Sequence, residues 1–159
     1  MIALLQRVSR AEVKIEGETL VAIDRGILAL VCAEPGDDES TAERMLERLL
    51  GYRVFSDGAG KMNLSVEDVQ GGLLLVPQFT LAADTSKGMR PSFSSALAPD
   101  AARTLFDHLV GRARSRYSKV ACGRFGEHMH VGLVNDGPVT FWLRASPAPG
   151  PDSGTPARL

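Results

Sequence analysis

The sequence predicts a mixed, strand-rich α/β domain in which two helices cover one side of a sheet. Three observations support this fold class. Short apolar segments are separated by Gly- and Pro-containing turns, residues 73–76 form an unbroken apolar run that is typical of a strand buried on both faces, and two other segments repeat apolar residues at helical spacing. A chain of 159 residues can form one domain with a substantial core.

The first part of the chain is expected to form four strands, at residues 2–8, 11–15, 20–23 and 27–32. Glycine-containing turns separate the last three of these strands. A further short strand is expected at residues 52–55, followed by a loop.

Two helices are predicted from the spacing of apolar residues. The first ends at Gly51, and its start can be capped either by Asp38 or by Ser40, the latter in a capping box with Glu43. The second begins at Pro99, because proline is favoured in the first turn of a helix, and it keeps an apolar face along its length.

The buried strand at residues 73–76 ends abruptly in polar chemistry. Gln78 and Thr80 place an amide and a hydroxyl where the apolar pattern would otherwise continue. Leaving such groups buried and unpaired costs roughly 1–3 kcal/mol each. They therefore either cap neighbouring backbone groups or belong to a functional site.

A second unusual segment, Asn135-Asp136-Gly137-Pro138, separates two expected strands at residues 129–134 and 139–143. In one interpretation it is a plain hairpin turn, with Pro138 at the start of a strand. In the other, the Gly137–Pro138 bond is cis, and the pair offers a rigid surface beside a ligand. The sequence leaves both interpretations open.

Composition limits the possible partners. The formal net charge of −1 excludes a globally basic nucleic-acid binder, so contact with RNA would need a local patch. Residues 111–126 contain Arg and Lys but no Asp or Glu, and they form either such a patch or a solvated helix end and loop.

Residues 146–159 are rich in Pro, Gly, Ser and Ala, so we expect a domain over 1–145 followed by a disordered tail.

Two cysteines are too few for a disulfide framework, and together with the lack of a signal peptide or a membrane span they predict a cytoplasmic protein. No metal site or cofactor is expected. His108, His128 and His130, even with Cys122 as a further ligand, lack the spacing of a zinc site. The motifs of serine hydrolases, of nucleoside triphosphatases and of dinucleotide-binding proteins are absent. If a reaction takes place here, the substrate itself can supply part of the catalyst.

Five segments carry a resemblance to a known family. They are MIALLQRVSRA at 1–11, GYRVFSDGAGKMNL at 51–64, VPQFTLAAD at 76–84, GMRPSF at 88–93 and LVNDGPVTFWL at 133–143. In this order and over about residues 1–145, the chain resembles bacterial D-aminoacyl-tRNA deacylase of the D-tyrosyl-tRNA(Tyr) deacylase family. The resemblance implies a homodimer with β/β/α layers. It also implies hydrolysis of the ester that joins a D-amino acid, or mischarged glycine on tRNA(Ala), to tRNA.

The resemblance also implies site residues. Gln78, Phe79 and Thr80 match the family's catalytic motif, and Gly137 and Pro138 match its Gly-cis-Pro motif, which reaches the partner's pocket and excludes L-amino acids. Phe125 and Met129 match residues that line the pocket, and Arg7 matches an arginine that fixes the Gly-Pro geometry. Pro77 departs from the usual serine of the family, which puts the strictness of chiral selection in question.

Three questions of mechanism and class stay open. Backbone N–H groups near Phe79 and Thr80 can hold a developing oxyanion. The resemblance implies that the 2′-hydroxyl of the terminal ribose helps to activate water. Alternatively, the Thr80 hydroxyl is the nucleophile, although no base is paired with it in the sequence. A non-catalytic RNA-binding module and a dimerisation scaffold are the alternatives to an enzyme.

Overall fold

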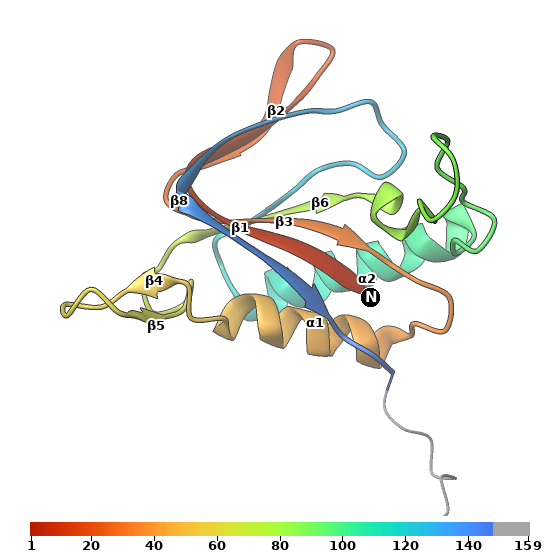
Figure 1. Cartoon of the computed structure of the whole chain (residues 1–159). Coiled ribbons are helices and arrows are strands. Elements are labelled where there is room, and N and C mark those ends of the chain that lie inside the picture. The colour runs from red at the N-terminus through yellow and green to blue at the C-terminus, as the bar shows by residue number, and fades with distance from the viewer. Residues whose placement is uncertain (148–159) are drawn as a thin grey trace, which may run out of the picture.

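Two helices pack side by side on one face of a strongly bent mixed sheet (Figure 1). The structure is a computed structural model and describes residues 1–147. The strands are β1 (Ile2–Ile15), β2 (Glu18–Ile23), β3 (Gly26–Cys32), β4 (Phe55–Ser56), β5 (Met62–Leu64), β6 (Gly72–Pro77), β7 (Val120–Cys122) and β8 (His130–Arg144). The helices are α1 (Glu39–Gly51), the short 3-10 helix η1 (Phe79–Ala82) and α2 (Pro99–Arg116). The predicted fold class is confirmed.

β1 organises the sheet. It pairs antiparallel with β2, β3 and β8, while β6 pairs parallel with β3 and β7 pairs parallel with β6. The strand order is β2-β1-β3-β6-β7. β3 pairs with the first half of β1 and β2 with its second half, while β8 pairs with both halves along the opposite edge of β1. The two strands expected at residues 2–8 and 11–15 are therefore one strand, because β8 accompanies β1 along nearly its whole length.

β6 is buried on both faces, as its sequence predicts. Alternate side chains of a strand point to opposite faces, and here Leu73 and Leu75 pack in the core beneath the helices. Leu74 and Val76 pack in a second core, which lies on the other face of the sheet together with residues of β1, β2 and β8. The bent sheet thus closes over its own inner face while the helices cover the outer one.

The hairpin of the first interpretation does not form, and the two strands expected at residues 129–134 and 139–143 are one strand. β8 runs through the segment as one strand that pairs with β1 before and after it. Gln6 pairs with Thr140 and Val8 pairs with Asn135, so four residues of β8 stand opposite the single Arg7 of β1. We call residues 136–139 the 136–139 bulge. A long partner strand allows the chain to bulge and continue where a turn would otherwise reverse it.

The start of α1 also differs in part from prediction. Asp38 caps the helix, and its carboxylate accepts a hydrogen bond of 2.8 Å from the Thr41 backbone N–H. The capping box is formed by Asp38 and Thr41, so the alternative box of Ser40 and Glu43 is wrong. Because the helix begins at Glu39, Ser40 lies inside its first turn.

Short elements differ most from the expectations. The strand expected at residues 52–55 is reduced to β4, which begins at Phe55 and pairs with β5. β5, β7 and η1 were not expected. Of the tail expected at 146–159, all but residues 146 and 147 lie outside the described residues, so the domain boundary stays a prediction.

Candidate active site

A cleft of about 470 Å³ opens where β6 ends and η1 begins. It brings together five of the site residues named with the family resemblance: Pro77, Gln78, Phe79, Phe125 and Met129. The remaining lining residues are Val76, Leu97, Pro99, Ala102, Gly126, Glu127, His128 and Val131. We call this hollow the candidate cleft. Its walls are largely apolar, with a few polar groups, as is common in small-molecule sites.

The end of β6 leaves two backbone donors without a protein acceptor in the described residues. The Gln78 N–H donates to the Val31 carbonyl at 2.7 Å, which extends the pairing of β3 and β6 by one residue. The backbone of Gln78 then turns into η1, whose Leu81 N–H returns to the Gln78 carbonyl at 3.2 Å. The N–H groups of Phe79 and Thr80 donate no hydrogen bond to another group in residues 1–147. These two neighbouring N–H groups therefore lack a protein acceptor in the described part of the chain.

Thr80 is exposed and does not line the candidate cleft. Its hydroxyl oxygen accepts a hydrogen bond from the Gln78 side-chain amide. Among the described hydrogen bonds, none joins this hydroxyl to a histidine, a carboxylate or an amine that could remove its proton. The contact orients the Gln78 side chain rather than activating Thr80.

Aromatic rings form two walls of the candidate cleft. The Phe79 ring is 57% exposed and packs against Phe93, with the ring centroids 5.2 Å apart. On the other side, the Phe125 ring packs against Phe106 of α2 at 6.4 Å. The Arg103 guanidinium lies 5.0 Å from the centroid of the Phe125 ring. These contacts fix both walls from outside the cleft.

Gly123 is a residue of this region that the sequence did not single out. A Cβ atom at this position would lie 2.8 Å from the Met129 sulfur and 3.4 Å from Cδ of Pro77. Glycine therefore lets the Met129 side chain pack beside Pro77. No periodicity or motif signals this role, because it depends on a contact between segments that are distant in sequence. The same holds for Leu97, which joins the cleft from the segment before α2.

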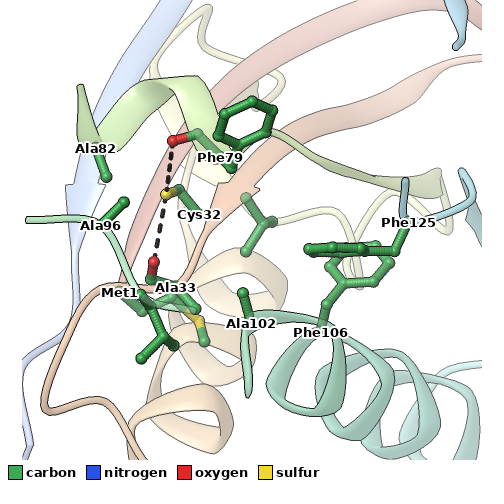
Figure 2. A pocket seen from close by; sticks show the side chains of 11 residues that line it. Met1, Cys32, Ala33, Phe79, Ala82, Ala96, Ala102, Phe106 and Phe125 are labelled. Carbon is green, nitrogen blue, oxygen red and sulfur yellow. Dashed lines mark hydrogen bonds between the residues drawn. The ribbon is translucent and has the colours of Figure 1, made fainter. Parts of the chain in front are cut away.

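A small apolar cavity of about 20 Å³ lies beneath η1, next to the candidate cleft (Figure 2). Its volume is close to the minimum that holds one water molecule, so it is too small for a substrate. The Cys32 sulfur lies 3.5 Å from the Phe79 carbonyl oxygen and 3.4 Å from that of Ala33, as the dashed lines in Figure 2 show. Burial raises the pKa of the Cys32 thiol, which keeps it protonated and able to donate. The thiol supports η1 from below.

Gly137 and Pro138 lie away from the candidate cleft of their own chain. They belong to the 136–139 bulge, and the peptide bond between them is cis, as in the second of the two sequence interpretations. The Arg7 guanidinium holds the bulge: it donates to the Asp136 carbonyl at 2.9 Å and to the Val54 carbonyl at 2.6 Å. Val54 directly precedes β4, which lies at the opposite end of the sheet from η1 (Figure 1).

The basic stretch at residues 111–126 does not form one surface. Arg112 pairs with Glu43 of α1 at 3.0 Å, and the Lys119 ammonium donates to the Gln70 carbonyl at 2.6 Å. Arg114 and Arg124 instead line a second groove, of about 440 Å³, that adjoins the candidate cleft. Only part of the predicted patch therefore faces the site.

The described residues contain no group of three or more His, Cys, Asp or Glu side chains placed to hold a metal ion. The histidines at 128 and 130 contact each other through their rings, 5.2 Å apart, while His108 lies on α2 beside two glutamates of α1. Within the same residues, no helix has both the length and the apolar character needed to cross a membrane.

Comparison with known proteins identifies the family. Residues 4–144 match the family model described as D-Tyr-tRNA(Tyr) deacylase. The chain belongs to this deacylase family. Two relatives are named D-aminoacyl-tRNA deacylase. The one from Janthinobacterium sp. (strain Marseille) is 62% identical to this chain, and the one from Thioalkalivibrio sulfidiphilus (strain HL-EbGR7) is 64% identical. Each alignment covers 92% of this chain and 99% of the relative. The family resemblance is confirmed, and with it the enzyme class, a hydrolase of the aminoacyl-tRNA ester bond.

Solved structures agree with the deacylase fold. A protein named c-Myc DNA Unwinding Element Binding Protein is 39% identical, with a TM-score of 0.87, and the match covers 93% of this chain and 100% of that one. A probable eukaryotic D-amino acid tRNA deacylase has a TM-score of 0.79 over 89% of this chain and 97% of its own. At 17% identity, the second match supports the fold alone.

Proposed function

We propose that this deacylase hydrolyses the ester between a D-amino acid and the terminal adenosine of tRNA, and that the reaction takes place in the candidate cleft. One observation carries the assignment to this place. The matched residues Gln78 and Phe79 line the cleft, and the N–H groups of Phe79 and of the neighbouring Thr80 have no protein acceptor in residues 1–147. An ester carbonyl placed there would develop its negative charge against these two donors.

The available groups favour stabilisation of the transition state over covalent catalysis. Removing one oxyanion donor from an enzyme typically costs about 2.7–4 kcal/mol of transition-state stabilisation. An ester is already activated, so two such donors and a positioned water account for the reaction without a protein nucleophile. In this mechanism Gln78 and Phe79 position the ester, Thr80 orients the Gln78 amide, and the 2′-hydroxyl of the terminal ribose helps to activate the water.

The mechanism is tested with a substrate that lacks the 2′-hydroxyl of the terminal adenosine. We expect its D-aminoacyl ester to be cleaved at least about a hundredfold more slowly than the normal substrate, because general acid–base help is typically worth 10²–10⁴-fold. Equal single-turnover rates on the two substrates would remove the 2′-hydroxyl from the mechanism.

Chiral selection is proposed to depend on a homodimer. By strand register, Arg7 and the 136–139 bulge lie level with Leu73, near the start of β6, whereas the cleft lies beyond Pro77 at its end. The bulge and the cleft are thus four residues apart along the strand direction, which is roughly 13 Å, and three strand spacings apart across the sheet, which is roughly 14 Å. The Gly137–Pro138 pair therefore reaches a cleft only if it belongs to the partner subunit.

The outer edge of β8 supports such a dimer. In the described part of the chain β8 pairs with β1 alone, and it exposes Leu133, Val134 and Trp142, the last at 54%. A long edge strand with exposed apolar side chains is normally covered by another chain. A partner docked along this edge would bring its own 136–139 bulge close to a second subunit.

A wall of backbone atoms would exclude L-side chains without needing to recognise the D-side chain. The enzyme is thus proposed to accept many D-amino acids, and also glycine, including glycine mischarged on tRNA(Ala). The decisive assay compares deacylation of matched D-, L- and glycyl-tRNA, with substrate alone as the control. Release of the amino acid from D-aminoacyl-tRNA and glycyl-tRNA, with L-aminoacyl-tRNA left intact, is expected, and release from none of the three would contradict the function.

Because aminoacyl-tRNA is used in the cytoplasm, the enzyme is proposed to act there, through a domain spanning residues 1–145.

A further inference from the structure

A second groove continues from the candidate cleft along the side of α2. Its volume is about 440 Å³, and it shares Phe125 and Glu127 with the cleft. Three guanidinium groups line it: those of Arg103 and Arg114 on α2 and that of Arg124 after β7. We call this hollow the arginine groove.

The guanidinium groups of the arginine groove lack carboxylate partners within residues 1–147. Arg103 lies over the Phe125 ring, and an Nη atom of Arg114 donates to the Cys122 sulfur at 3.2 Å. None of the three arginines takes part in an ion pair in that part of the chain. Cationic groups that form no ion pair with the protein are suited to an anionic ligand.

We propose that the arginine groove binds phosphates of the single-stranded 3′ end of tRNA while the aminoacyl ester occupies the candidate cleft. The proposal rests on the proposed function. Guanidinium groups bind phosphate oxygens in a bidentate manner, which suits Arg to this role better than Lys. The 11-residue step from Arg103 to Arg114 on α2 spans about 16 Å. Since a stacked strand rises about 3.4 Å per nucleotide, more than one phosphate can be reached.

The position of Phe125 gives the path of the strand. Its ring lines both hollows, so a nucleotide whose ester reaches Gln78 is followed, on its 5′ side, by nucleotides that can pass over Phe125 into the arginine groove. Aromatic rings of this kind stack on bases in single-stranded nucleic acid sites.

Asp107 and Glu127 also line the groove, so three arginines and two carboxylates leave a formal excess of one positive charge. Their carboxylates would repel a phosphate that strayed from the guanidinium groups.

The test compares a substrate with phosphates and one without. The double variant Arg114→Gln/Arg124→Gln removes two groove cations, and Arg116→Gln is the matched control, because Arg116 is exposed on the same helix but does not line the groove. Each protein is assayed on D-aminoacyl-tRNA and on the corresponding D-aminoacyl-adenosine. We expect the double variant to lose roughly tenfold more kcat/KM on the tRNA than on the adenosine ester, mainly through KM. On the tRNA substrate, the slope of log kcat/KM against log salt concentration should become shallower by about 0.7 for each phosphate that the variant no longer neutralises.

Equal losses on the two substrates, or an unchanged salt dependence, would overturn the arginine groove while leaving the proposed function intact. If wild-type protein releases amino acid from neither substrate, the proposed function fails instead. Binding of uncharged tRNA, measured by fluorescence anisotropy for the wild type, the double variant and Arg116→Gln, still decides the groove in that case. Wild-type affinity in the double variant would exclude it, and weaker binding in the double variant alone would support it.

Discussion

At the scale of single residues, the contact between Gln78 and Thr80 defines what each can do. The Thr80 hydroxyl accepts from the Gln78 amide and makes no hydrogen bond to a base in residues 1–147, so we propose that its role is to hold Gln78. We predict that Thr80→Ala slows single-turnover deacylation of D-aminoacyl-tRNA by about tenfold, the cost of removing one orienting hydrogen bond. Thr80→Ser should retain most activity. A complete loss in folded Thr80→Ala, together with an acyl-enzyme trapped in the wild type, would instead identify Thr80 as the nucleophile.

A second residue-scale prediction concerns Gly137. Its φ angle is +146°, and an added Cβ would lie 2.7 Å from Cγ2 and 2.9 Å from the backbone nitrogen of Val139. Gly137→Ala must therefore displace the 136–139 bulge. Because the bulge stands outside the pairing of β1 and β8, we expect folded protein in which the ratio of D- to L-aminoacyl-tRNA deacylation falls by at least about tenfold.

The control for that experiment is Gly17→Ala. Gly17 also has a positive φ, +85°, but an added Cβ would meet no atom within 4 Å. This variant imposes the backbone cost alone, at a position in the turn between β1 and β2. An equal change in the D-to-L ratio for both variants would show that Gly137 has no special part in selection.

At the scale of secondary structure, the cap of α1 makes stability depend on pH. Hydrogen bonds from the Ser40 hydroxyl, and then from the Thr41 side chain and backbone, lower the pKa of Asp38 from 3.8 to about 2. A depressed carboxyl pKa means that the stabilisation is present above the unfolded pKa, near 4, and is lost as the pH falls through about 2. Asp38→Ala should lower Tm at pH 6, and the difference from wild type should shrink toward pH 2. Asp38→Asn keeps a capping group that does not titrate, so it should stay closer to wild type across this range.

The elements also show which features can be read from a single sequence. β6 and both helices are predictable because their periodicity is local and their partners only bury it. The Asn-Asp-Gly-Pro segment gives the same local signal in a turn and in a bulge, and the length of β1 decides between them. β5 and β7 are three residues each, too short for any period to be visible.

The candidate site divides in a similar way. Gln78 and Thr80 could be singled out from the residues alone, because polar groups interrupt a buried strand. Phe125 and Met129 come from a distant segment, and only the family resemblance pointed to them. Arg114 and Arg124 of the arginine groove belong to a basic stretch whose members lie on different surfaces, so counting charges could not separate Arg114 from Arg112.

At the scale of the whole molecule, the proposed exchange of Gly-Pro motifs can be tested with mixed dimers. One subunit carries Phe79→Ala, which damages its cleft, and the other carries Gly137→Ala; different affinity tags isolate the mixed species. If the bulge acts on the partner's cleft, the surviving cleft faces an intact bulge, and the mixed dimer should show the wild-type ratio of D- to L-aminoacyl-tRNA deacylation. If the bulge acts within its own chain, the ratio should equal that of the Gly137→Ala homodimer.

The 136–139 bulge has a consequence for how this fold can change. Residues on either side of it are held to β1 by separate registers, with Gln6 opposite Thr140 and Val8 opposite Asn135. An inserted or deleted residue within a regular strand turns every following side chain to the wrong face. Inside the bulge, the same change alters only how far the loop projects. Evolution, or a protein engineer, can therefore adjust the reach of this segment while both halves of β8 keep their alignment.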